Sequence, residues 1–139
     1  MIIDLTGSRG FIGSHLIAAL KDNGHTVVEW DRNPAVNKDI ANYEPSTGVG
    51  YVIHLAAMAD VRRSIKDPKP YWENNVINTT RIQKKCSEAG ARLIYASSSC
   101  AHRWWLSPYG TTKKVNEATA GDRQIGLRFT TVYGPGARD

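Results

Sequence analysis

Three evenly spaced glycines constrain the fold of this chain more than any other feature. Gly7, Gly10 and Gly13 follow an apolar run at residues 2–5 and overlap the start of an amphipathic stretch at residues 11–21. An apolar run, a glycine turn and a helical pattern in this order predict a strand, a tight loop and a helix. The free N–H groups at the start of such a helix, together with its positive dipole end, can bind phosphate.

The pattern continues into a second strand that ends at an acidic residue. Asn23-Gly24 is a helix-stop signal, residues 25–30 are rich in strand formers, and Asp31 stands 18 residues after Gly13. In a dinucleotide-binding unit the glycines permit the tight turn, the approach of the pyrophosphate and close helix–strand packing, and the acid binds the ribose diol. The residues of this unit that we predict to bind a dinucleotide are Gly7, Arg9, Gly10, Phe11, Ile12, Gly13, Asp31 and Arg32.

The choice between NAD and NADP depends on the charges near the end of the second strand. Asp31 favours NAD because its carboxylate repels the additional phosphate of NADP. Arg9 in the glycine turn and Arg32 after the acid could instead hold that 2′-phosphate, or both could be solvated surface residues. We predict NAD, and NADP stays open because of the two arginines.

Strand-like and helix-like segments alternate along the remaining sequence. This alternation predicts an α/β fold with a doubly wound, parallel Rossmann-type sheet, in one domain at residues 1–139. The residues at 36–40 are only weakly strand-like. The predicted strands are residues 2–6, 25–30, 36–40, 51–57, 92–98 and 125–133, and the predicted helices are residues 11–21, 71–88 and 109–119.

Composition excludes several other classes of function. No apolar run approaches the roughly 20 residues needed to cross a bilayer, and the N-terminus lacks the features of a secretory signal, so we expect a cytoplasmic protein without a membrane partner. The net charge of +5 favours anionic ligands, but the basic residues are scattered and are not interleaved with aromatics, which argues against nucleic acid. The two cysteines are expected to be reduced, and no ligand cluster predicts a metal.

A tyrosine and a lysine with helical spacing predict proton-transfer chemistry. Tyr109 has Lys113 four residues later, so both side chains share one face of a helix. A nearby ammonium favours the phenolate, which can then act as a general base. Ser97, Ser98 and Ser99 end the preceding strand at the carboxyl edge of the sheet, where open α/β folds bind ligands. The alternative is that these serines satisfy backbone groups at the strand end, and we favour it for Ser97.

Several motifs in the same order resemble one family along almost the whole chain. The segments TGSRGFIGSHL, HLAA, YASSS, SPYGTTKK and GLRFTTVYGPG, with Asn74-Asn75-Val76, resemble the cofactor domain of extended short-chain dehydrogenases/reductases. Within them the resemblance is to the NAD-dependent nucleotide-sugar epimerase/dehydratase group. TTKKVNE and GLRFTTVYGPG are most similar to UDP-glucuronate 4-epimerases.

The resemblance implies an active site and a substrate class. It implies that Ser99, Tyr109 and Lys113 are catalytic. It also implies that a tyrosinate takes a proton from a sugar hydroxyl while hydride passes to the nicotinamide. The hydride later returns to the other face of the keto sugar. A nucleotide sugar, with a UDP-sugar favoured, would be the substrate. The further cofactor contacts that it implies are Asp39 and Ile40 at the adenine, Leu55, Ala56 and Ala57 along the cofactor, and Asn75, Tyr109 and Lys113 at the site.

The same resemblance implies an oligomer. Members of this family commonly dimerise by packing two helices of each subunit into a four-helix bundle, and residues 71–88 and 109–119 represent those helices here. We therefore predict a homodimer or a larger homo-oligomer.

The chain departs from the family pattern in its length and in one loop. The family continues after the YGPG turn into a substrate-binding domain, so we expect that C-terminal domain to be missing, and CAHRWWL replaces a longer loop between Ser99 and Tyr109. Asp4 interrupts the apolar first strand, and we expect it to reach solvent or a partner. Trp104 and Trp105 either close over the nicotinamide or stack on a substrate base, or they cover exposed core or a subunit contact, which we favour.

Three hypotheses about function remain open on the sequence. We predict a small working oxidoreductase. The alternatives are a dinucleotide-binding module without catalysis of its own and the cofactor half of an enzyme whose substrate half is a separate polypeptide.

Overall fold

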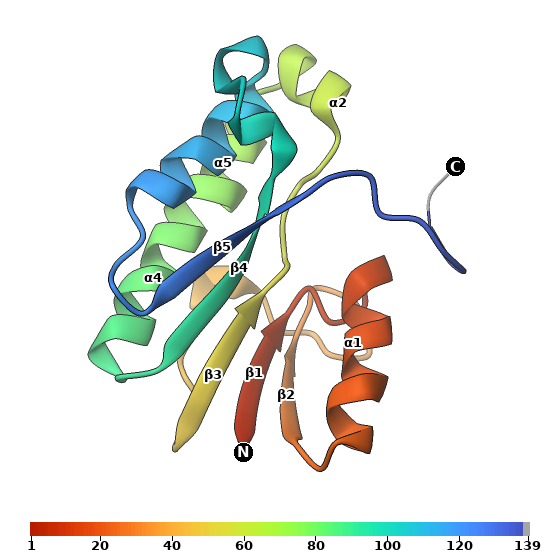
Figure 1. The fold of residues 1–139 in the computed structure, drawn as a ribbon, viewed down its shortest axis with the longest axis vertical. Coiled ribbons are helices and arrows are strands. Elements are labelled where there is room, and N and C mark those ends of the chain that lie inside the picture. Colours follow the sequence, from red (N-terminus) through yellow and green to blue (C-terminus); the bar gives the residue numbers. More distant parts are fainter. Residues whose placement is uncertain (138–139) are drawn as a thin grey trace.

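The computed structural model describes residues 1–137 and shows a parallel sheet flanked by helices (Figure 1). The strands are β1 (Ile2–Thr6), β2 (Thr26–Trp30), β3 (Val49–His54), β4 (Arg92–Ser98) and β5 (Gln124–Phe129). The α-helices are α1 (Phe11–Asp22), α2 (Val61–Lys66), α3 (Lys69–Tyr71), α4 (Asn78–Glu88) and α5 (Pro108–Ala118). The other helical turns are η1 (Ile40–Asn42), the π-helical η2 (Trp72–Ile77), η3 (Ser99–Ala101) and η4 (Trp104–Leu106).

The order of the strands determines where a ligand can bind. The sheet runs β2-β1-β3-β4-β5, and all neighbouring pairs are parallel. The chain therefore builds outward from β1 in both directions, and the order reverses between β1 and β3. In open α/β sheets the crevice at the carboxyl ends of the strands beside this reversal is the usual binding place. The predicted Rossmann-type fold is confirmed.

Helices cover the two faces of the sheet unequally. Helix α1 packs on one face, and α4 and α5 pack on the other (Figure 1). On the α1 side, Ile125 and Leu127 of β5 are 60% and 44% exposed, so that end of the sheet has an open apolar face. The main buried cluster lies between the sheet and α4 and consists of Ile40, Tyr43, Val52, Ile82, Cys86, Ala91, Leu93 and Tyr95.

The segment between β2 and β3 covers the sheet without a full helix, and Asp4 holds it in place. The Tyr43 hydroxyl donates a 2.8 Å hydrogen bond to Oδ2 of Asp4, and the N–H of Ser46 donates a 2.9 Å hydrogen bond to the same atom. Asp4 is fully buried, so the expectation that it reaches solvent or a partner is wrong. Burial and the Asp4 carboxylate raise the pKa of Tyr43, which keeps its phenol protonated as the donor.

Some predicted elements differ from those in the structure. Residues 36–40 do not form a strand, because turns take up the local backbone groups: the N–H of Asn37 bonds to the carbonyl of Asn33, and Asn37 has a φ of 52°. Strand β5 ends at Phe129 instead of residue 133, because β4 ends at Ser98, the residue that pairs with Phe129.

The helical segments also differ in detail from the prediction. The helix expected at residues 71–88 begins as α3 and the π-helical turn η2, and only its later part is the regular helix α4. The short helix α2 was not predicted. Asp60 caps it by accepting a 2.9 Å hydrogen bond from the N–H of Arg63.

Candidate active site

The glycine turn brings three segments of backbone so close together that side chains would not fit. Gly7 has a φ of +70°, and a Cβ on it would lie 2.7 Å from the backbone nitrogen of Ala56. A Cβ on Gly13 would lie 2.1 Å from the carbonyl oxygen of Gly7. Both values are far below contact distance, so β1, the start of α1 and the loop after β3 pack at this distance only with glycine.

Two cavities, each of about 550 Å³, lie on either side of this turn at the carboxyl edge of the sheet. Gly7, Gly10, Leu55 and Ala57 line both of them, so the two cavities adjoin along the turn. The first cavity extends towards α5, and the second extends towards the end of β2. Together they form an elongated groove, and at the turn in its middle Gly7 and Gly10 present backbone without side chains.

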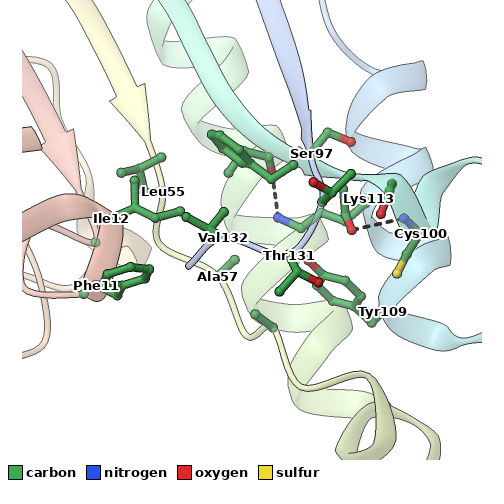
Figure 2. A pocket seen from close by; sticks show the side chains of 18 of the residues that line it. Phe11, Ile12, Leu55, Ala57, Ser97, Cys100, Tyr109, Lys113, Thr131 and Val132 are labelled. Atoms are coloured by element: carbon green, nitrogen blue, oxygen red, sulfur yellow. Dashed lines mark hydrogen bonds between the residues drawn. The ribbon is translucent and has the colours of Figure 1, made fainter. Parts of the chain in front are cut away.

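In the first cavity, side chains from both halves of the sheet face one another (Figure 2). Phe11 and Ile12 approach from α1, while Tyr109 and Lys113 approach from α5. The segment after β5 crosses towards α1, where Nε2 of His15 lies 2.9 Å from the carbonyl oxygen of Pro135.

Lys113 is buried beside Tyr109 and is tethered to the sheet. Its Nζ lies 5.8 Å from the centre of the Tyr109 ring and donates a 2.7 Å hydrogen bond to the carbonyl oxygen of Ala96 on β4. The side chain is almost fully buried, and burial lowers the pKa of Lys113 to about 8. At neutral pH the ammonium is therefore mostly charged, and it lies where it can stabilise negative charge on a neighbouring phenol.

The three serines at the end of β4 have different surroundings. Ser97 donates a 2.6 Å hydrogen bond to Oε1 of Glu117, so its partner is a side-chain carboxylate and not the strand-end backbone group that was predicted. The Ser98 hydroxyl accepts a 3.1 Å hydrogen bond from the N–H of Cys100 and caps η3. Ser99 is exposed and lines the first cavity, and within residues 1–137 its hydroxyl has no hydrogen-bond partner. Of the three, Ser99 alone has a hydroxyl not already bonded to protein.

In the second cavity, Asp31 lies between two backbone donors. Its Oδ2 accepts a 2.9 Å hydrogen bond from the N–H of Arg9, and its Oδ1 accepts a 2.8 Å hydrogen bond from the N–H of Asn33. These bonds orient the carboxylate at the end of β2, on the rim of the cavity. Each oxygen keeps a lone pair for a further donor such as a ribose hydroxyl.

Most of the residues predicted for cofactor binding lie on this groove. Asp39 and Asn75 lie outside both linings. Asp39 forms an ion pair with Arg32, and the buried Asn75 side chain bonds to both backbone groups of Met58. The predicted residues that do line the groove are Gly7, Arg9, Gly10, Phe11, Ile12, Gly13, Asp31, Arg32, Ile40, Leu55, Ala56, Ala57, Tyr109 and Lys113.

The groove also has lining residues that the sequence analysis missed. Asn74 lines the second cavity where Asn75 was expected, because the π-helical turn η2 directs both of these neighbours inward. Lys38 lines the same cavity, and residues 129–132 after β5 line the first. The rule that ligands bind at the carboxyl ends of parallel strands could have identified residues 129–132. Nothing in the sequence distinguishes Asn74 from Asn75.

Trp104 and Trp105, in the loop between β4 and α5, lie away from the groove. Trp104 and Trp105 are 42% and 61% exposed and line neither of the two cavities, which does not fit a role in closing over a nicotinamide. Trp105 instead borders an apolar groove with Ile65, Trp72 and Leu106. Within residues 1–137, no group of three His, Cys, Asp or Glu could hold a metal, and no helix is long and apolar enough to cross a membrane.

A family model matches the part of the chain that builds this groove. The model of the NAD dependent epimerase/dehydratase family matches residues 3–103, from β1 to the loop after β4. The chain belongs to this family. The epimerase/dehydratase resemblance of its motifs is thereby confirmed.

Individual relatives in the epimerase/dehydratase family match nearly all of this chain but only part of themselves. Protein CapI of Staphylococcus aureus is 33% identical over 99% of this chain and 56% of its own length. UDP-glucuronate 4-epimerase 3 of Arabidopsis thaliana is 30% identical over 96% of this chain and 43% of its own. The solved structure of MoeE5 in complex with UDP-glucose and NAD is 33% identical, with a TM-score of 0.86, and the match covers 99% of this chain and 57% of that one. The chain spans about half the length of these relatives.

Proposed function

We propose that this chain binds NAD along the groove and supplies the proton-transfer residues of a nucleotide-sugar epimerase or dehydratase. The observation that carries the proposal is that Ser99, Tyr109 and Lys113 line the same cavity as the glycine turn. The relation to a protein solved with UDP-glucose and NAD supports both the cofactor and the substrate class.

The shape of the groove fits a dinucleotide. A pyrophosphate needs close approach to backbone N–H groups, and the glycines between the two cavities leave that backbone bare. Asp31 at the far end of the second cavity suits the adenosine ribose, which assigns the first cavity to the nicotinamide. We therefore propose NAD as the cofactor. When bound, it supplies the hydride acceptor and donor.

The residues of the first cavity have separate roles in the proposed reaction. The Tyr109 phenolate takes the proton of a sugar hydroxyl as the hydride leaves the same carbon, and it returns that proton in the reverse step. Lys113 stabilises the phenolate through its charge, and Ser99 donates a hydrogen bond to the sugar oxygen. The pH range over which this works has an upper limit near the pKa of Lys113, at about 8.

A second candidate function is that of a cofactor-binding half without catalysis of its own. The groove supports it because both cavities and the glycine turn lie within the residues that the structure describes, in a chain that spans about half of the length of its relatives. In that case the isolated chain would bind NAD and leave every sugar nucleotide unchanged.

One experiment distinguishes the two functions. The chain is incubated with NAD and a panel of UDP-sugars, and the anomeric proton signals are followed by NMR, with Tyr109→Phe as the inactive variant and Tyr133→Phe as a control at an exposed tyrosine. New signals with wild type and Tyr133→Phe, but not with Tyr109→Phe, support the enzyme. NAD binding without any new signal supports the cofactor-binding half, and absence of NAD binding contradicts both.

A further inference from the structure

The rim of the second cavity carries more positive charge than an NAD site needs. Arg9, Arg32 and Lys38 all line this cavity, with Asp31 as the acidic residue among them. Free guanidinium groups beside the ribose are well suited to a 2′-phosphate, so these side chains alone would favour NADP. The contribution of these three side chains to phosphate binding depends on the contacts that they already make within the protein.

Arg9 is paired with a carboxylate on the strand that carries Asp31. Its Nε lies 2.9 Å from Oε2 of Glu29, two residues before Asp31 on β2. The Glu29 side chain is only 18% exposed, and Lys21 approaches its other oxygen at 3.9 Å. Because Glu29 is partly buried and lies between Arg9 and Lys21, its carboxylate has a fixed position. The ion pair therefore holds the Arg9 guanidinium against β2.

Arg32 is paired in the same way with an acid from the following loop. Its Nε donates a 2.8 Å hydrogen bond to Oδ2 of Asp39, and its Nη2 donates a 3.3 Å hydrogen bond to Oδ1 of Asn74. Partial burial raises the pKa of Asp39, but the hydrogen bond from the Ala41 N–H and the ion pair with Arg32 outweigh it and leave the pKa below its ordinary value. Asp39 is therefore ionised at neutral pH.

The third cation is turned towards an aromatic ring. The Lys38 ammonium lies 5.3 Å from the centre of the Trp30 ring. Both arginines on this rim have a carboxylate partner and Lys38 faces the Trp30 ring, so Asp31 is the acidic lining residue that a ribose substituent meets in this cavity.

We propose that Glu29 and Asp39 are specificity-determining residues that make this site select NAD by occupying the two arginines. A 2′-phosphate would meet two guanidinium groups whose charges Glu29 and Asp39 already compensate, and it would also face the Asp31 carboxylate. The selectivity is thus assigned to two acids that line neither cavity as well as to the acid that does. This inference rests on the proposed function of the groove as an NAD site.

The test replaces both acids by their neutral isosteres and measures dinucleotide binding. The affinities of NAD and NADP for wild type and for the Glu29→Gln/Asp39→Asn double variant are determined by titration calorimetry. We expect wild type to prefer NAD by more than tenfold. In the double variant, freed guanidinium groups should tighten NADP binding about tenfold or more, with NAD affinity changed less than about threefold.

A matched control separates local pairing from net charge. Glu88→Gln/Asp122→Asn makes the same chemical changes at exposed positions near the opposite, amino-terminal edge of the sheet. It should leave both affinities within about twofold of wild type, because charges at that distance are screened by salt. An equal gain in NADP affinity in this control would overturn the inference.

Removing the arginines provides a second, independent variant. If the acids already occupy both guanidinium groups, Arg9→Gln/Arg32→Gln should change the ratio of NAD to NADP affinity less than about threefold. A tenfold selective loss of NADP binding would mean that the arginines already bind the 2′-phosphate in wild type, which overturns the inference. If wild type binds NAD but Glu29→Gln/Asp39→Asn gains no NADP affinity, the selectivity proposal alone is refuted. If neither wild type nor any variant binds a dinucleotide, the proposed function is refuted as well.

Discussion

Replacing Lys113 by methionine should make the protein more stable while it removes the proposed activity. Below pH 8 the lysine is protonated in both the folded and the unfolded state, and folding then has to bury its charge. The difference between the ordinary pKa of 10.5 and the folded value of about 8 corresponds to a cost of about 3 kcal/mol. Methionine avoids this cost but loses the hydrogen bond to Ala96, which is worth about 1 kcal/mol. The expected gain in the free energy of unfolding at pH 7 is therefore about 2 kcal/mol.

The pH dependence of this gain is a stricter test than its size. Between pH 8 and 10.5 the folded protein loses the Lys113 proton before the unfolded protein does, so the cost of burial falls as the pH rises. Urea unfolding of wild type and Lys113→Met should thus show a constant difference up to about pH 8 that shrinks towards pH 10.5. The exposed neighbour Lys114 serves as the control, and Lys114→Met should stay within about 0.5 kcal/mol of wild type. Two results would refute the buried-charge reasoning. One is a Lys113→Met variant that is less stable than wild type at pH 7, and the other is a difference in the free energy of unfolding that does not change with pH.

Three further predictions concern stability and assembly. The hydrogen bonds and charge of Arg128 lower the pKa of Glu117 to about 2. This carboxylate should therefore stabilise the fold above pH 4.5 and lose that effect as the pH falls towards 2. In acid unfolding, Glu117→Gln should lower the free energy of unfolding by about 1–2 kcal/mol at pH 7 and leave it unchanged at pH 2. Tyr43→Phe leaves Asp4 with one hydrogen bond fewer in the core and should cost about 2 kcal/mol in urea unfolding. If α4 and its preceding turn form the dimer bundle, Ile77→Lys at a 49% exposed position should convert the dimer to monomer in sedimentation experiments, and an unchanged dimer would exclude that surface.

The sequence was sufficient where local pattern and backbone geometry coincide. The glycine spacing and Asp31 predicted the first strand–helix–strand unit, because Gly7 and Gly13 are required by approaches between backbone atoms that leave no room for a Cβ. Ser107-Pro108 predicted the start of α5, because the serine side chain caps the helix by accepting a 3.0 Å hydrogen bond from the N–H of Gly110.

The parts that could not be predicted depend on contacts between distant segments. In the sequence, Asp4 interrupts an apolar strand without a visible reason. The structure supplies the reason, because Tyr43, 39 positions later, donates a hydrogen bond to the Asp4 carboxylate. The partners of Arg9 and Arg32 likewise follow from the way that β2 and the next loop pack. The π-helical turn that directs Asn74 into the groove has no signature in the sequence. Periodicity and spacing carry no information about any of these contacts.

The loop between β4 and α5 contributes to the positions of the proposed catalytic residues. Ser98 caps η3 and Ser107 caps α5, and the Thr111 hydroxyl donates a 3.1 Å hydrogen bond to the carbonyl oxygen of Trp104 between them. A Cβ on Gly110 would lie 3.0 Å from the carbonyl oxygen of Cys100, so the loop packs directly on the first turn of α5. Contacts with other elements complete this placement, because the N–H of Tyr109 donates a 3.1 Å hydrogen bond to the Ser64 hydroxyl on α2 and Lys113 bonds to Ala96 on β4. The proposed proton-transfer residues are therefore held jointly by β4, by α2 and by the loop that joins β4 to α5.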